Sequence, residues 1–190
     1  EITKRFIPAM EALDTLAPGN KILVKLEAYS DIRDAGLCYY IGSPVEYISG
    51  SADKNSKQIS LNKITVKNQA TLGDDNDNLS KLRVFYGFNE LYKRLRWDAK
   101  FLKYVNEGLV FYPTQEFKSD EEMQKALAKA KIIILAEGKR YDPTTKKDEK
   151  DYDEVRRLNL YIDLIKYEGG TIEHSPCCNP AAECLPIEKK

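Results

Sequence analysis

The chain has 190 residues, which is enough for one domain with its own hydrophobic core. It carries 30 basic and 30 acidic residues, so its net charge is zero and no overall field attracts nucleic acid or an anionic membrane. No apolar run approaches the roughly 20 residues that a membrane-spanning helix needs. The chain begins with Glu1 rather than Met, and we expect that a leader, a lipid-anchored segment or a tag was removed before it.

The N-terminal part is predicted to be a short helix followed by a strand. Apolar residues between positions 6 and 16 have helical spacing, and the spacing ends at Pro18-Gly19-Asn20, a combination that breaks helices. Apolar and charged residues then alternate over positions 22–28, which is typical of a half-buried strand.

Further strands are predicted before position 67. Residues 37–41 and 45–48 are strand-like and flank the turn signal Gly42-Ser43-Pro44, so this part is predicted to be antiparallel β-structure. Residues 49–57 are small and polar and indicate a surface loop. Residues 59–66 indicate another strand, whose alternation slips once as at a β-bulge.

An acidic segment follows, in which Asp74, Asn76 and Asn78 have the alternate spacing of ligands in a calcium-binding EF-hand loop. The sixth position of such a loop is Leu79 instead of Gly, and the twelfth is Phe85 instead of Glu. The pattern therefore favours a plain acidic loop over a calcium site.

The most regular helical pattern runs from 88 to 105 and predicts a helix at 89–106, with Asn89 as a cap and Gly108 just past the end. Its other faces carry basic residues interleaved with aromatic ones: Lys93, Arg94, Arg96, Lys100 and Lys103, with Trp97, Phe101 and Tyr104. These faces indicate either a surface for RNA or a protein partner, or a second packed aromatic stripe beside solvated lysines. The zero net charge favours the packed stripe. The candidate partner surface comprises Lys93, Arg96, Trp97 and Lys100.

A short strand and a second helix are predicted next. Residues 109–112 form a buried type of strand, closed by Pro113. Ser119 begins a capping box, since Glu122 lies where its carboxylate can reach back to the cap amide. The helix is predicted at 119–130, with a narrow apolar face of Met123, Ala126, Leu127 and Ala130 that allows close packing on a sheet.

The rest of the chain is predicted to complete the sheet. Residues 132–136 are continuously apolar, which predicts a central strand buried on both faces, and residues 140–154 indicate a charged loop. Residues 158–164 alternate as a strand, although their apolar spacing also fits a helix. The dipeptide Gly169-Gly170 then predicts a hairpin turn, with residues 171–174 as the returning strand.

The cysteines suggest a separate feature. Three of the four, Cys177, Cys178 and Cys184, lie near the C-terminus with the only histidine, His174, and the fourth is Cys38. Four residues, His174, Cys177, Cys178 and Cys184, are candidate zinc ligands, but no usual zinc spacing is matched. Disulfides among the four cysteines, free thiols and a metal site remain open interpretations.

Three segments carry a resemblance to a known family: "NEGLVFYPTQEF", "MQKALAKAKIIILAEGKRYD" and "VRRLNLYIDLIKYEGGTIEHS". Their order of helix, short strand, alanine-rich helix, apolar strand and alternating strand resembles the bacterial envelope lipoproteins that activate penicillin-binding proteins. It is also similar to the curli-secretion lipoprotein and the N-terminal domain of the Tol translocation protein. The segment "ITVKNQATLGDDNDN" resembles the opening strand and loop of that family.

The resemblance covers about half of the chain, and the β-rich first 60 residues and the cysteine tail depart from it. It implies a periplasmic or extracytoplasmic protein, tethered to a membrane only through a removed lipid anchor, whose partners are other cell-envelope proteins. It supplies no binding residue for this chain.

No phosphate-binding loop, nucleophile elbow or paired catalytic carboxylates stand out, so we expect no catalytic residues and no cofactor. The predicted fold is one α+β domain over 1–190, with a mixed or mainly antiparallel sheet packed by two to three helices. Residues 1–60 are a β-rich extension, 61–175 the core and 176–190 an irregular tail. The predicted function is a non-catalytic cell-envelope accessory or scaffold protein. The alternatives are an intracellular adaptor or RNA-associated factor using helix 89–106, and a secreted effector with an unrecognised active site.

Overall fold

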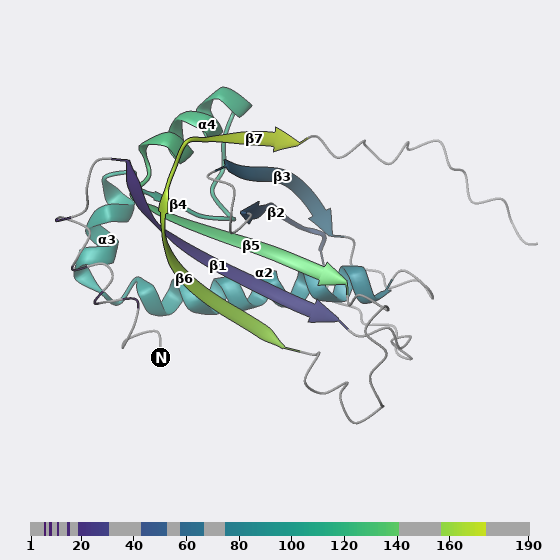
Figure 1. Cartoon of the computed structure of the whole chain (residues 1–190). Coiled ribbons are helices and arrows are strands. Elements are labelled where there is room, and N and C mark those ends of the chain that lie inside the picture. The colour runs from purple at the N-terminus through teal and green to yellow at the C-terminus, as the bar shows by residue number, and fades with distance from the viewer. Residues whose placement is uncertain are drawn as a thin grey trace, which may run out of the picture.

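The computed structural model describes residues 6, 8, 11, 15, 19–30, 43–52, 58–66, 75–140 and 157–173. These residues form three helices and seven strands in two mixed sheets (Figure 1), which confirms the predicted α+β class. Most of the predicted N-terminal helix, the predicted strand 37–41, most of the charged loop 140–154 and the cysteine tail lie outside the described residues.

The main sheet has the strand order β4-β5-β1-β6. Strands β4 (Val110–Phe111), β5 (Ile132–Arg140) and β1 (Asn20–Ser30) are parallel, and β6 (Leu158–Lys166) is antiparallel to β1. The predicted strand at 132–136 is confirmed as an inner, buried strand. The strand at 22–28 is also confirmed, but the prediction that it is half-buried is wrong. Its alternate polar positions face a second layer of the protein instead of solvent.

The second sheet has the order β2-β3-β7. Strands β2 (Val45–Ala52) and β3 (Gln58–Val66) are antiparallel. The antiparallel structure was predicted for 37–41 with 45–48 instead, and β2 extends to Ala52 through residues predicted to be a surface loop. Strand β7 (Gly169–Glu173) pairs in parallel with β3, so the predicted hairpin with β6 is wrong. Figure 1 shows the chain crossing from β6 in the main sheet to β7 beside β3.

The crossing from β6 to β7 explains why residue 170 is a glycine. A methyl group on Gly170 would lie 2.6 Å from a Leu127 side-chain carbon and 3.2 Å from the Ile59 carbonyl oxygen. Gly170 therefore permits β7 to pass between β3 and the neighbouring helix, which is a role in packing rather than in a tight turn.

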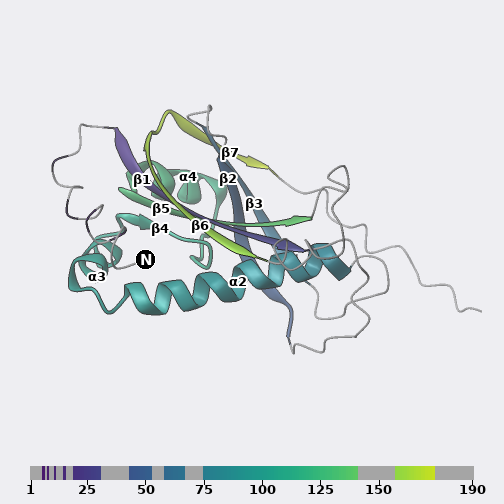
Figure 2. The same cartoon turned by 60° about the horizontal axis from the view of Figure 1, so that its bottom comes forward.

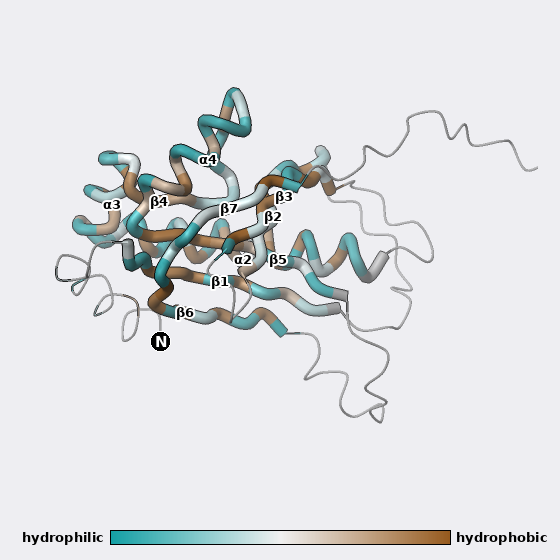
Figure 3. Tube along the Cα trace, turned by 45° about the horizontal axis from the view of Figure 1, so that its top comes forward, coloured by the Kyte–Doolittle hydropathy of each residue, from teal (hydrophilic) through white to brown (hydrophobic). Residues whose placement is uncertain are grey.

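The main sheet is covered on both faces, which creates two hydrophobic cores. Helices α2 (Asp75–Leu95) and α3 (Ala99–Asn106) cover one face, where they bury residues such as Val24, Phe88 and Ile134. Helix α4 (Asp120–Lys129) and the second sheet cover the other face, where Leu23 and Ile133 are buried. Figure 2 shows α2 running along the sheet, and Figure 3 shows hydrophobic stretches of β1 and β5 at the centre of the molecule.

The first strand belongs to this centre. It was predicted to lie in an extension outside a core of residues 61–175, but it pairs with β5 on one side and with β6 on the other. The sequence does not show that β1 pairs with β5, because parallel partners such as Ile22 and Ile132 are far apart in the chain.

The helix predicted at 89–106 is two helices. Helix α2 already begins at Asp75, so the segment predicted to be an acidic loop forms its first turn, and α2 ends at Leu95. Asp98 then caps α3, because its carboxylate accepts a hydrogen bond from the Phe101 amide at 2.9 Å. The apolar spacing continues through this break, and it therefore did not reveal the break.

The capping box of α4 is confirmed in part. The Ser119 hydroxyl accepts a hydrogen bond from the Glu122 amide at 3.2 Å, as predicted. The Glu122 carboxylate, however, accepts from the amide of Lys118 at 2.8 Å, one residue before the predicted donor.

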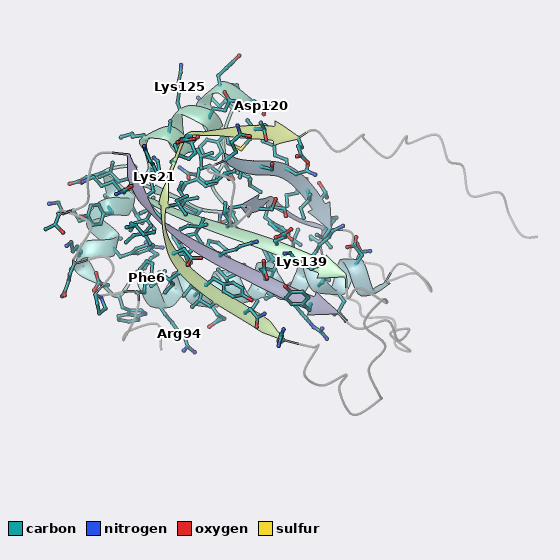
Figure 4. The ribbon with its side chains drawn as sticks, in the orientation of Figure 1. Phe6, Lys21, Arg94, Asp120, Lys125 and Lys139 are labelled. Atoms are coloured by element: carbon teal, nitrogen blue, oxygen red, sulfur yellow. The ribbon has the colours of Figure 1, made fainter. Side chains whose placement is uncertain are left out.

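At the other end of α4 the buried Lys21 ammonium donates to the carbonyl oxygens of Ala128 at 2.6 Å and Leu127 at 3.2 Å (Figure 4). A cation at a helix C-terminus complements the helix dipole.

The backbones of α2 and β5 approach closely at Gly138, where an added methyl group would lie 2.6 Å from the Lys81 backbone nitrogen. We predict that Gly138→Ala lowers the free energy of unfolding by about 2 kcal/mol, because backbone atoms cannot rotate away from the clash. Chemical denaturation followed by circular dichroism measures the change. The matched control is Gly87→Ala, where the added methyl group meets only the flexible end of Leu158 and alanine favours the helix. Equal stability of the two variants would contradict this account of the packing.

Candidate functional site

Among the described residues, the large hydrophobic side chain with the greatest exposure is Trp97, which lies at the junction of α2 and α3. The chain turns there through short backbone hydrogen bonds, from the Arg96 amide to the Tyr92 carbonyl at 3.0 Å and from the Trp97 amide to the Arg94 carbonyl at 3.2 Å. With the Asp98 cap these bonds fix the direction of the backbone. We call the surface formed by Lys93, Arg94, Arg96, Trp97 and Lys100 the α2–α3 corner.

The aromatic residues of this region separate into two groups. Phe101 and Tyr104 are buried, and the Phe101 ring contacts Tyr92 with 6.0 Å between ring centroids. The prediction of a packed aromatic stripe is therefore confirmed for these two residues. Trp97 is different, because 90% of its surface is exposed. An indole left in water at a rigid helix junction provides a large contact area at little cost in conformational entropy.

The charges of the corner are mostly basic. The Arg96 guanidinium lies over the Tyr92 ring, 5.9 Å from its centroid. Lys93 forms an exposed ion pair with Glu90, 3.0 Å between Nζ and Oε1, and this hydrogen bond lowers the pKa of Glu90. The four residues of the predicted partner surface lie within positions 93–100, where Lys93, Arg96 and Trp97 are exposed and Lys100 is partly buried. That they form a partner surface stays a prediction.

The other predicted site residues cannot be placed. Cys38, His174, Cys177, Cys178 and Cys184 all lie outside the described residues. The disulfide, thiol and zinc interpretations therefore remain predictions. Among the residues that the structure describes, no three His, Cys, Asp or Glu side chains are grouped so that they could hold a metal ion.

A second polar feature was not predicted: a charged cluster on the main sheet, formed by Lys25, Glu27 and Tyr29 of β1 with Glu137 and Lys139 of β5. Glu27 is paired directly with Glu137 in the parallel register. The Glu27 carboxylate lies 2.6 Å from the Lys25 ammonium and 2.8 Å from that of Lys139. The Tyr29 hydroxyl donates to the same carboxylate at 2.6 Å.

This cluster shifts the titration of its members. Burial alone raises the pKa of Glu27, but hydrogen bonds from Lys139, Lys25 and Tyr29 outweigh it and lower the pKa to about 2. Burial and the hydrogen bond to Glu27 raise the pKa of Tyr29 to about 12. For Lys139, burial opposes the charge, but Glu27 and Glu137 raise its pKa above the ordinary value.

The arrangement stabilises the fold rather than providing a reactive group at neutral pH. Glu27 stays ionised, Lys139 stays protonated, and each carboxylate faces lysines on its neighbours. The sequence contained a weak signal for the cluster, because charges occur at every second position in both "VKLEAY" and "AEGK". That signal becomes informative only when β1 and β5 are known to pair in register.

A shallow apolar groove lies on the opposite side of the sheet, between α2 and β6. Its volume is about 240 Å³, and it is lined by Leu26, Gly87, Glu90, Leu91, Arg94, Leu158 and Leu160. The close contact of Leu158 with Gly87 brings the edge strand near the helix. Arg94 connects the rim of the groove to the α2–α3 corner.

Comparisons with protein-family models, with curated proteins and with solved structures find no match to this chain. In the described part of the chain, no helix is both long and apolar enough to cross a membrane.

The charged cluster gives a prediction with a defined pH dependence. Glu27→Gln is expected to lower the free energy of unfolding at pH 7 by about 3 kcal/mol, because it leaves two lysines facing an uncharged amide. The folded pKa of Glu27 is about 2 and its ordinary value is 4.5. The stabilisation is therefore fully present above pH 4.5, and the difference between wild type and variant decreases as the pH falls toward 2.

Thermal unfolding at several pH values measures this difference. The control is Glu90→Gln, which removes an exposed ion pair and should leave the melting temperature unchanged. A Glu27→Gln variant as stable as wild type at pH 7 would show that the cluster does not stabilise the protein.

Proposed function

We propose that this protein is a non-catalytic accessory or scaffold protein of the cell envelope, and that it binds another protein through the α2–α3 corner. The observation that carries the proposal is the exposure of Trp97, the only tryptophan of the chain. Tryptophan and arginine are the residues most often found at the energetic centre of protein interfaces. The envelope location rests on the resemblance of three segments to the envelope lipoproteins.

The rigidity of the corner supports the proposal. Trp97 lies between two helices, and the Asp98 cap and the buried Phe101 hold the following helix in place. A partner therefore does not have to order this segment on binding, which reduces the entropic cost of the complex. Because the exposed Arg94 and Arg96 are near Trp97 in the chain, the partner's complementary surface is expected to be acidic at its rim and apolar at its centre.

The proposal is tested with Trp97→Ala. The variant should unfold within about 0.5 kcal/mol of wild type, since the side chain packs against little of the protein. It should bind its envelope partner at least about 30-fold more weakly, the loss typical of a hot-spot residue. Capture from the envelope fraction of the native cells, followed by affinity measurement, provides the result.

The matched control is Tyr86→Ala, which removes another exposed aromatic side chain, 46% accessible, from α2. This variant should bind normally. Equal binding by wild type and Trp97→Ala would remove the corner from the interface, and a partner found only in the cytosol would contradict the envelope location.

An RNA-binding measurement distinguishes the proposed function from the alternative of an RNA-associated factor. We expect no measurable binding of single-stranded RNA by the wild-type protein at physiological salt, because the chain has no net positive charge. Electrophoretic mobility shift or fluorescence anisotropy measures it. If wild type does bind RNA and the triple variant Lys93→Glu, Arg96→Glu, Lys100→Glu loses that binding, the RNA function is supported instead.

A further inference from the structure

The main sheet has an open edge at β6. In the strand order β4-β5-β1-β6, β6 is the last strand, and within the described ranges no other strand pairs with its outer side. Its large apolar residues are unusually accessible, since Leu158 is 47% exposed and Leu164 is 57% exposed. Edge strands are usually protected by proline, by inward-pointing charge or by a covering segment. Strand β6 (Leu158–Lys166) contains no proline, and its charged residues are Asp163 and the terminal Lys166.

The hydrogen bonds to β1 show which backbone groups point outward. The Tyr29 amide donates to the Arg157 carbonyl at 3.1 Å, and the Tyr167 amide donates to the Gly19 carbonyl at 3.2 Å. In both bonds the residue on the β6 side, Arg157 or Tyr167, is odd-numbered. Because bonded and non-bonded pairs alternate in an antiparallel ladder, the even-numbered residues direct their N–H and C=O groups away from β1. Those residues are Leu158, Leu160, Ile162 and Leu164.

The sequence of β6 is nearly symmetric about Tyr161. Reading outward from Tyr161 in either direction gives an apolar residue, then a polar residue, then a leucine, in the order "LNLYIDL". We propose that a second copy of this chain pairs with the open edge of β6, antiparallel and about a two-fold axis at Tyr161. The two main sheets then form one continuous sheet.

This register satisfies both faces of the joined sheet. Leu158 lies opposite Leu164 of the partner subunit, and Leu160 lies opposite Ile162 of the partner subunit, so the exposed leucines cover each other. All four are even-numbered, and the pairing therefore also satisfies the outward backbone groups.

The charges on the other face agree with the same register. Asn159 lies opposite Asp163 of the partner subunit, where the amide can donate to the carboxylate. Arg157, which is exposed, lies diagonally across from the same carboxylate, within reach of a long side chain. The two-fold axis repeats each interaction. A strand with one Asp and one Arg placed in this way is complementary to itself, so a second copy is the occupant that the edge favours.

The apolar groove beside the edge adds to this surface. Leu158 and Leu160 form one wall of the groove, and Leu164 of the partner subunit is placed next to Leu158 at its mouth. The pairing thus extends the core between α2 and the sheet toward the second copy.

The test is the molar mass of the full chain, measured by size-exclusion chromatography with light scattering over a series of concentrations. We expect a dimer that dissociates on dilution. Leu164→Lys should shift the protein to monomer, because it places two ammonium groups in the new apolar row, while its circular dichroism spectrum stays that of wild type. Tyr86→Lys is the control, since it places the same charge at an exposed position on α2, and it should remain a dimer.

Amide hydrogen exchange resolved by NMR identifies the surface independently of mass. The amides of Leu158, Leu160, Ile162 and Leu164 should become protected as the concentration rises and lose that protection in Leu164→Lys. Three results would overturn the proposal. They are a monomer at every concentration, a dimer that Leu164→Lys leaves intact, and protection of these four amides that does not depend on concentration, which would mean that the chain covers its own edge.

Discussion

Strand β1 is buried on both faces and yet carries the charged residues Lys21, Lys25 and Glu27, each of which needs a partner inside the protein. The fold meets this requirement in two ways. Lys21 donates to the last carbonyl groups of α4, and Glu27 is surrounded by Lys25, Lys139 and the Tyr29 hydroxyl. Both arrangements depend on the parallel pairing of β1 with β5, which places α4 and the charges of β5 beside these residues.

The central position of β1 and β5 also determines which parts of the protein lie at the surface. Because β1 and β5 occupy the centre, β6 becomes the edge of the main sheet, and β7 has to cross to the second sheet. Helix α2 is long enough to cover the sheet, and its C-terminal end carries Trp97 past the edge of the core. The exposed indole and the open strand edge are thus two separate consequences of one arrangement.

The sequence predicted local structure better than pairing. The capped helix at 119–130, the buried strand at 132–136 and the strand at 158–164 follow from capping residues and apolar spacing, which are local signals. The position of β1 and the crossing to β7 depend on contacts between distant segments, and no local pattern contains them. The break at Asp98 is made by a local cap, but the apolar spacing continues through it and predicts one helix. For the site, the sequence found the residues of the α2–α3 corner. It could not show that Phe101 is buried while Trp97 is exposed, since both occur in the same helical pattern.

We propose that the protein acts by presenting Trp97 to another protein of the cell envelope. Site-specific photo-crosslinking tests it most directly, with a photoreactive amino acid at position 97 in cells that make the protein natively. The account predicts a discrete crosslink to one envelope protein from position 97 and none from position 86 on α2. Identical crosslinking patterns from the two positions, or no crosslink from position 97, would contradict it.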